Sequence, residues 1–216
     1  MPEWKAPAPF DDADLRRSVT AVLDGGELPP IVQAGHPVLR ARALPFTGQL
    51  SATELAGLIA VMTEVMRAAP GVGLAAPQIG VPLQLAVMED LYEVSAENAA
   101  ARERHPLDFL AILNPRYTPV GTATASHYEG CLSMSGWQAV VDRAIAVELR
   151  YDDDHGTART RRFSGWQARI VQHETDHLAG TLYIDKAHTR SLASNAEYSA
   201  NWAHPDVAYA RAKLNF

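Results

Sequence analysis

The feature that most constrains this chain is a pair of histidines, His173 and His177, with Glu174 beside the first of them. The surrounding residues favour a helix that begins near Ser164 and ends at Gly180. Residues four apart share one face of a helix, so both imidazoles project together and can hold one metal ion. Glu174 is placed to handle the proton of a water that the metal activates. The sequence therefore predicts a helix that faces a metal site.

Two imidazoles do not complete a catalytic metal site, which usually has three protein ligands and one open position. The downstream candidates for a third ligand are His188, Glu197 and His204, all in a polar stretch. The upstream candidate is Cys131, which follows Gly130 and whose thiolate a metal would stabilise. The residues alone leave both alternatives open.

Cys131 is the only cysteine in 216 residues, so no intrachain disulfide can form and a reducing compartment is expected. A lone cysteine can equally be a small buried hydrophobe. The formal net charge of −6 argues against a protein that grips phosphate backbones. No apolar run reaches the roughly 18 residues of a membrane span, and the first residues do not read as a secretory signal. We expect a soluble, cytoplasmic protein.

Helical patterns predict three further helices. The first begins at one of two aspartates, residues 11–12, and ends at Gly25. The second begins with the capping box of Ser51 and Glu54 and carries a regular apolar stripe. The last is expected around residues 208–214.

Runs rich in Val, Ile and Leu predict strands at residues 83–87, 110–113 and 139–151. A cluster of turn-forming residues at 153–156 is expected to join two antiparallel strands. Residues 89–108 show no period and read as a long surface loop. Together these elements predict a single α+β domain.

Residues 71–78, GVGLAAPQ, contain two glycines and two alanines. Such small residues indicate that a substrate strand or a packed helix closely approaches the backbone of this segment. The run lacks the spacing and the lysine of a phosphate loop, so nucleotide binding is not expected.

Three segments in this order, GVGLAAPQ (residues 71–78), EGCLS (residues 129–133) and QHETDH (residues 172–177), closely resemble the signature motifs of the peptide deformylases. The resemblance covers roughly residues 31–185. It implies one α+β domain in which mixed and antiparallel β-sheets pack around a central metal-binding helix.

The same resemblance implies how the chain is divided. Residues 31–185 would form the deformylase catalytic domain, and residues 1–30 an N-terminal extension with a short helix. Residues 186–216 would be a C-terminal tail that belongs to the same domain.

When the functional residues of the family are carried over one by one, the resemblance implies that Cys131, His173 and His177 are the metal ligands. It makes Glu174 the general base and then the general acid. The side-chain amide of Gln78 and the backbone N–H of Leu132 would donate to the oxyanion that develops on the formyl group.

The substrate is expected to bind as an extended peptide, aligned by backbone hydrogen bonds to Val72, Gly73 and Gly130. Trp166 and Ile170 lie on the histidine side of their helix and are expected to wall an apolar pocket for the methionine side chain, although Trp166 can equally be ordinary core.

Side chains that contact the metal ligands, rather than the metal itself, are also expected. Glu129 can accept a proton from a ligand imidazole and so fix its tautomer. Asp176 points away from the histidine face and is expected to pair with Arg143 or Arg169, the latter standing where the family commonly has an apolar residue. His127 also departs from the family pattern. We expect its side chain to be exposed on a strand; the alternative is that it faces the substrate pocket.

The implied activity is removal of the formyl group from the N-terminal formyl-methionine of nascent polypeptides, which releases formate. A water activated by one divalent ion would attack the formyl carbonyl. The family implies Fe(II), and Zn(II) or Ni(II) suit the same ligands. The implied partners are the N-formyl-methionyl peptide and, transiently, the ribosome, with no membrane contact and no direct nucleic-acid specificity. The alternatives are an inactive deformylase-like module that binds peptides or the ribosome, and a metallopeptidase with a downstream third ligand.

Overall fold

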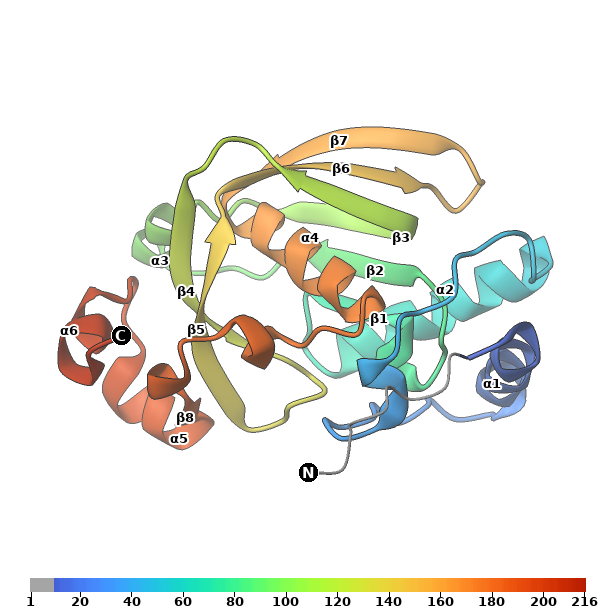
Figure 1. Ribbon diagram of the computed structural model, residues 1–216, viewed down its shortest axis with the longest axis horizontal. Helices are drawn as coiled ribbons and strands as arrows, with labels where there is room; N and C mark the ends of the chain where they lie inside the picture. The colour runs from blue at the N-terminus through green and yellow to red at the C-terminus, as the bar shows by residue number, and fades with distance from the viewer. Residues whose placement is uncertain (1–9) are drawn as a thin grey trace, which may run out of the picture.

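The computed structural model describes residues 10–216, so the first nine residues of the predicted N-terminal extension lie outside it. Helix α4 (Gly165–Leu178), which carries the histidine pair, runs through the middle of the fold (Figure 1). It contacts strands of both β-sheets, and eight of its residues other than the histidines are buried. The predicted α+β domain with antiparallel sheets around a central helix is confirmed.

The larger sheet has five strands in the order β1-β2-β3-β6-β7, and all neighbours are antiparallel. Its strands are β1 (Gly73–Ala75), β2 (Leu85–Asp90), β3 (Leu107–Pro119), β6 (Ala146–Asp152) and β7 (Ala158–Ser164). The smaller sheet has the order β4-β5-β8. Its strands are β4 (Thr124–Gly130), β5 (Trp137–Ala144) and β8 (Ala193–Ser194). Strands β1 and β4 are therefore both edge strands, each with one side free to pair with another chain.

Two helices cover the larger sheet at one end of the molecule (Figure 1). Helix α1 (Asp12–Asp24) and helix α2 (Ala52–Ala68) both begin with a capping box, formed by Asp11 in one and by Ser51 in the other. Their apolar stripes pack on each other and on the interior side chains of β1 and β2, forming one core cluster. Both helices thus confirm the sequence prediction.

The predicted surface loop at residues 89–108 is wrong. These residues complete β2, form helix α3 (Ala96–Arg102) with Ser95 as its N-cap, and begin β3. Helix α3 has no buried residue, so its sequence carries no apolar stripe from which a helix could be recognised. The turn at residues 153–156 joins the antiparallel strands β6 and β7, as expected, although no bounds were predicted for β7, in which Phe163 is the only buried side chain.

The remaining elements are short helices, two of which precede β2 in the chain while the others follow α4. They are η1 (Pro37–Arg40), η2 (Ala76–Ile79), η3 (Tyr183–Lys186), η4 (Thr189–Ser191), α5 (Asn195–Glu197), η5 (Tyr198–Trp202) and α6 (Ala208–Leu214). Helix α6 confirms the predicted last helix. Side chains of the tail pack on Tyr128 and Val140 of the smaller sheet. No helix in residues 10–216 is long and apolar enough to cross a membrane.

Candidate active site

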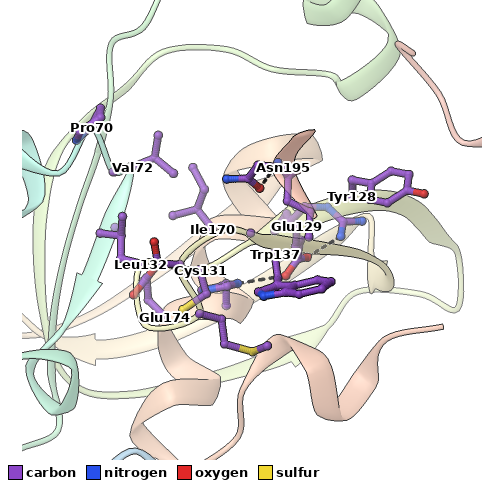
Figure 2. A pocket seen from close by; sticks show the side chains of 18 of the residues that line it. Pro70, Val72, Tyr128, Glu129, Cys131, Leu132, Trp137, Ile170, Glu174 and Asn195 are labelled. Carbon is purple, nitrogen blue, oxygen red and sulfur yellow. Dashed lines mark hydrogen bonds and ion pairs between the residues drawn. The ribbon is translucent and has the colours of Figure 1, made fainter. Parts of the chain in front are cut away.

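The three motifs meet around one cavity of about 490 Å³ (Figure 2). Strand β1 and the turn η2 bring in the glycine-rich segment, the end of β4 brings in Cys131, and α4 brings in the histidines. The cavity opens between the two edge strands, β1 and β4. Most of the predicted site residues line it: Val72, Gly73, Gln78, Glu129, Gly130, Cys131, Leu132, Trp166, Ile170, His173 and Glu174.

Cys131, His173 and His177 form a compact group of possible metal ligands. One ligand atom from each side chain lies within 4.8 Å of the others, and the Cys131 Sγ is 3.3 Å from the His177 Nε2. Within residues 10–216 this is the only group of three or more His, Cys, Asp or Glu side chains that could hold an ion in this way. The downstream candidates are not part of it; His188, for example, contacts Asp142 of β5 instead.

The donor set fits a divalent transition metal. Burial lowers the pKa of His177 well below its ordinary value. Burial alone would also lower the pKa of His173, but hydrogen bonds to Cys131 and Glu129 raise it well above its ordinary value, and a metal ion requires the neutral form of both imidazoles. His173 contacts Glu129 through Nδ1 at 3.0 Å, which leaves its Nε2 for a metal. One thiolate and two imidazoles suit iron, zinc or nickel, and a fourth position would remain for a water or substrate.

Glu129 is a buried anion that organises this centre. Its carboxylate accepts two hydrogen bonds from Arg143, at 2.8 and 2.9 Å, and one from Arg169 at 2.5 Å, besides its contact with His173. Burial alone would raise the pKa of Glu129, but the Arg143 guanidinium outweighs that effect and holds the pKa well below its ordinary value. A permanently charged Glu129 fixes the orientation and tautomer of His173.

The charge network continues from Glu129 through Arg143 to Asp176 on α4. Arg143 also donates to Asp176 at 2.6 Å, and Asp176 accepts further hydrogen bonds from Lys186 at 2.6 Å and from the Tyr117 hydroxyl at 3.1 Å. Asp176 therefore pairs with Arg143, one of its two predicted partners, while Arg169 pairs with Glu129.

Glu174 is as buried as Glu129 but has far fewer partners. Its Oε2 is buried and has no hydrogen-bond partner in the part of the chain that the structure describes. Burial raises the pKa of Glu174 to about 7. A Cβ atom at Gly73 would lie 2.4 Å from the Glu174 Oε1, so only glycine leaves room for this carboxyl group. The close approach of α4 to Gly73 agrees with the sequence expectation that a packed helix or a substrate strand approaches this segment.

Gln78 is held in a fixed orientation at the cavity. Its Oε1 accepts a hydrogen bond from the Ala75 N–H at 2.8 Å, so its amide nitrogen faces the cysteine. That Nε2 lies 3.6 Å from the Cys131 Sγ and 3.3 Å from the Ser133 Oγ. The Leu132 N–H donates to no acceptor within residues 10–216, whereas the Leu132 carbonyl accepts from Gln33. The Leu132 N–H is thus without an acceptor among these residues, whereas the Gln78 amide nitrogen contacts Ser133 and Cys131.

Several cavity residues were not indicated by the sequence. They come from α3, from β4 and β5, and from the C-terminal tail: Arg102, Tyr128, Trp137, Gln138, Asn195 and Tyr198. No motif marks them, because only the tertiary fold brings α3 and the tail to the cavity. Some of them are labelled in Figure 2, beside Ile170 and Glu129.

The expectation that His127 is an exposed strand histidine is wrong. Its side chain is buried, with 8% of its surface exposed, and its ring packs edge-on against Trp166 at 5.9 Å between centroids. It does not line the main cavity but a second one of about 50 Å³, together with Arg143, Arg169 and Trp166. The pattern of β4 did not reveal this, because α4 covers the side of the strand that carries His127.

Comparisons with known proteins agree with this geometry. The family described as polypeptide deformylase matches residues 28–192. The chain is 49% identical to peptide deformylase 1 of Streptomyces coelicolor over 208 residues, which cover 96% of this chain and 95% of that protein. It is 36% identical to the human mitochondrial peptide deformylase over 201 residues, 88% of this chain and 83% of that protein.

Solved structures give the same result. A class I type b peptide deformylase of Acinetobacter baumannii bound to Met-Ala-Ser is 27% identical, with a TM-score of 0.67, over 74% of this chain and 98% of that one. The peptide deformylase of Thermotoga maritima is 32% identical, with a TM-score of 0.63, over 74% of this chain and 98% of that one.

Proposed function

This chain belongs to the polypeptide deformylase family and acts as a metal-dependent peptide deformylase on N-formyl-methionyl peptides, and from that premise we propose which residues carry the reaction. The proposed metal ligands are Cys131, His173 and His177. One observation supports the proposal above all: their ligand atoms lie within 4.8 Å of one another, in a cavity that also holds a carboxyl oxygen without a partner.

The proposed metal is Fe(II), and the donor set accommodates Zn(II) or Ni(II) as well. When bound, the ion supplies Lewis-acid chemistry, which activates a water and polarises the formyl carbonyl. The chain supplies the ligand geometry, because Glu129 fixes the ring of His173 and α4 fixes the spacing of the two imidazoles.

Glu174 moves the proton in the proposed reaction. It takes a proton from the attacking water while the new carbon–oxygen bond forms. It then returns that proton to the departing amide nitrogen as the carbon–nitrogen bond breaks, so the products are formate and a free amino terminus. A pKa of about 7 suits both transfers, since a group that titrates near the operating pH is an effective base and an effective acid.

Gln78 and Leu132 stabilise the charge that develops on the formyl oxygen. The amide of Gln78 is already oriented by Ala75, and the Leu132 N–H has no competing acceptor in residues 10–216. Donors that are fixed before the reaction need no reorganisation, and one such donor typically lowers the barrier by about 3 kcal/mol.

The peptide is proposed to lie between the free edges of β1 and β4. Backbone groups of Val72 and Gly73 on one side and of Gly130 on the other would pair with it. The methionine side chain would then run along Ile170 toward Trp166, which lie one and two turns before His173 on α4. We place the catalytic domain at residues 31–185, with residues 1–30 as an extension and 186–216 as a tail of the same domain.

The substrate is a nascent chain, so we further propose a cytoplasmic enzyme that meets the ribosome transiently. The direct test of this function is formate release from formyl-Met-Ala-Ser by protein loaded with Fe(II) or Ni(II), beside a Cys131→Ala variant. The loaded protein should release formate, and the variant should lose both metal and turnover.

Two results would contradict the assignment. Fully metallated protein without turnover would indicate an inactive relative, and a Cys131→Ala variant that kept its metal and activity would require another third ligand. Metal analysis of protein purified without oxygen should find iron; zinc in its place would refute the Fe(II) proposal alone.

A further inference from the structure

Three arginines surround the indole ring of Trp166. The guanidinium carbons of Arg102, Arg104 and Arg169 lie 5.0, 5.7 and 5.8 Å from its ring centroid. Trp166 lines the main cavity two helical turns before His173, so a side chain that starts at the metal centre and follows Ile170 ends at this ring. The far end of an otherwise apolar pocket is therefore cationic.

Two of the three arginines are fully engaged within the protein. Arg104 forms a two-fold hydrogen bond with the buried carboxylate of Asp90, at 2.7 and 2.8 Å. Arg169 donates to Glu129 and to the carbonyl oxygens of Val141 and Ala125. Each of the two charges is thus paired with a carboxylate of the protein.

Arg102 differs from both. In the part of the chain that the structure describes, it has no acidic partner and makes no hydrogen bond, and its Nε is buried without an acceptor. The indole Nε1 of Trp166 is likewise buried and unpartnered. Arg102 lines the main cavity and also the smaller cavity beside it, so the space around its guanidinium is not filled by protein. These two buried donors have no acceptor among the described residues, a state that costs free energy until an acceptor arrives.

The position of Arg102 is fixed by the surrounding structure. It is the last residue of α3, and the following Glu103 packs its backbone against Gly165, where a Cβ atom would lie 2.4 Å from the Glu103 carbonyl oxygen. Gln167 of α4 donates to the Pro106 carbonyl at 2.7 Å. Helix α3 is thus attached to the first turn of α4, and Arg102 reaches the pocket from a fixed element.

We propose that Arg102 recognises a hydrogen-bond acceptor at the tip of the first side chain of the substrate, so that the enzyme deformylates peptides that begin with formyl-methionine sulfoxide as well as those that begin with formyl-methionine. The inference rests on the proposed pocket along Ile170 and Trp166. A thioether sulfur is a weak acceptor, whereas a sulfoxide oxygen is a strong one. A sulfoxide buried without a donor would be strongly disfavoured in an apolar pocket, and Arg102 supplies that donor.

The test compares three peptides on Ni(II)-loaded protein: formyl-Met-Ala-Ser, its sulfoxide as separated epimers, and formyl-norleucine-Ala-Ser, in which a methylene replaces the sulfur. The readout is the ratio of kcat/KM for the sulfoxide to kcat/KM for the norleucine peptide. Any loss of folded or metal-loaded protein cancels in this ratio. In Arg102→Leu the ratio should fall by about tenfold or more for at least one epimer, because a hydrogen bond to a charged donor is lost.

Two further variants complete the test. Arg102→Lys keeps the charge and part of the donor capacity and should retain an intermediate ratio. Arg16→Leu removes one exposed cation from α1, remote from the pocket, and should leave the ratio unchanged. The ratio of methionine to norleucine should fall only a few-fold in Arg102→Leu, since sulfur accepts weakly.

An unchanged sulfoxide ratio in Arg102→Leu would overturn the proposal and leave Arg102 as a support for Trp166. A native enzyme that rejects both sulfoxide epimers while it hydrolyses the norleucine peptide would overturn it equally. Failure to hydrolyse formyl-Met-Ala-Ser at all would instead contradict the proposed function.

Discussion

The regions around Glu129 and Glu174 lie in one cavity and contain equally buried carboxyl groups, 5% and 4% exposed, yet they have opposite character. Glu129 contacts Arg143, Arg169 and His173, and its pKa is held well below its ordinary value. Glu174 has one oxygen without a partner among the described residues, and burial raises its pKa to about 7.

The difference shows that burial alone does not decide what a carboxyl group can do. Desolvation penalises the charge of both groups, and the number of donors around each decides the outcome. A carboxylate saturated with cationic donors stays charged and can only orient its neighbours. A carboxyl group that titrates near neutrality can accept a proton and return it. This contrast supports the proposed roles, with Glu129 as a positioning residue and Glu174 as the proton carrier.

The largest effect is expected from Glu174→Gln. Glutamine keeps the shape of the side chain but cannot take a proton, so kcat/KM for formyl-Met-Ala-Ser should fall by about 10²- to 10⁴-fold. Metal content and the midpoint of thermal unfolding should not fall, because an unfavourably buried carboxyl group is replaced by a neutral one. Formate release, elemental analysis and thermal unfolding measure the three quantities.

The matched variant is Glu129→Gln, which changes the other carboxyl group in the same way. This variant should mainly lower the affinity of the protein for its metal, by about 10- to 100-fold, as is typical when the hydrogen-bond partner of a metal-ligating histidine is lost. Turnover per bound metal should stay well above that of Glu174→Gln. Equal losses of turnover per bound metal in the two variants would show that the distinction is wrong.

A smaller but still large effect is expected on stability from Arg143→Met. The Arg143 side chain is only 2% exposed and pairs with Glu129 and Asp176, so its loss leaves two buried carboxylates with fewer partners. Breaking a buried ion pair in this way typically costs about 3–5 kcal/mol. Urea unfolding of the metal-loaded protein measures the change.

The control for this change is Arg150→Met on the outer face of β6. Arg150 is 75% exposed, and its contact with Glu148 is 3.3 Å long. Exposed pairs of this kind contribute about 1 kcal/mol or less. If both variants lost the same stability, the network around Glu129 would not be the structural support inferred for it.

Much of this arrangement could be predicted from the sequence, where local patterns carry the information. The capping boxes at Asp11 and Ser51 fixed where two helices begin, and the spacing of His173 and His177 on a helix indicated a metal site. These features depend on residues close together in the chain, so they can be recognised without the fold.

The remainder depends on tertiary contacts that no local pattern records. Helix α3 lacks an apolar stripe because none of its residues is buried, and so its role in bringing Arg102 to the cavity was hidden. The exposed state expected for His127 was wrong because α4 covers that side of β4. The two guanidinium groups on Glu129 come from β5 and α4, which meet only in the folded protein.

The smallest expected effect is a change in how stability depends on pH, and it concerns His127, which lies beside Arg169 as Glu129 does. Burial, reinforced by Arg169 and Arg102, lowers the pKa of His127 to about 4, while Glu129 and Asp206 oppose that shift. The same guanidinium therefore favours the charge on Glu129 and disfavours it on His127. In the unfolded chain His127 takes up a proton near pH 6.5, and in the folded protein it does so only near pH 4. The unfolded state binds more protons in this window, so the native protein loses stability as pH falls through it.

Replacing the imidazole removes this contribution. Between pH 7.5 and pH 4.5, the free energy of unfolding of His127→Phe should rise relative to the native protein by about 2 kcal/mol, the amount that a shift of this size supplies. Taking the difference between the two proteins cancels the acid sensitivity of the metal ligands, which both share. His155→Phe, at a side chain that is 83% exposed, is the matched control and should show no such change. A constant difference between His127→Phe and the native protein across this range would mean that the pKa of His127 is the same in the folded and the unfolded protein, and that Arg169 does not act on the two groups in opposite directions.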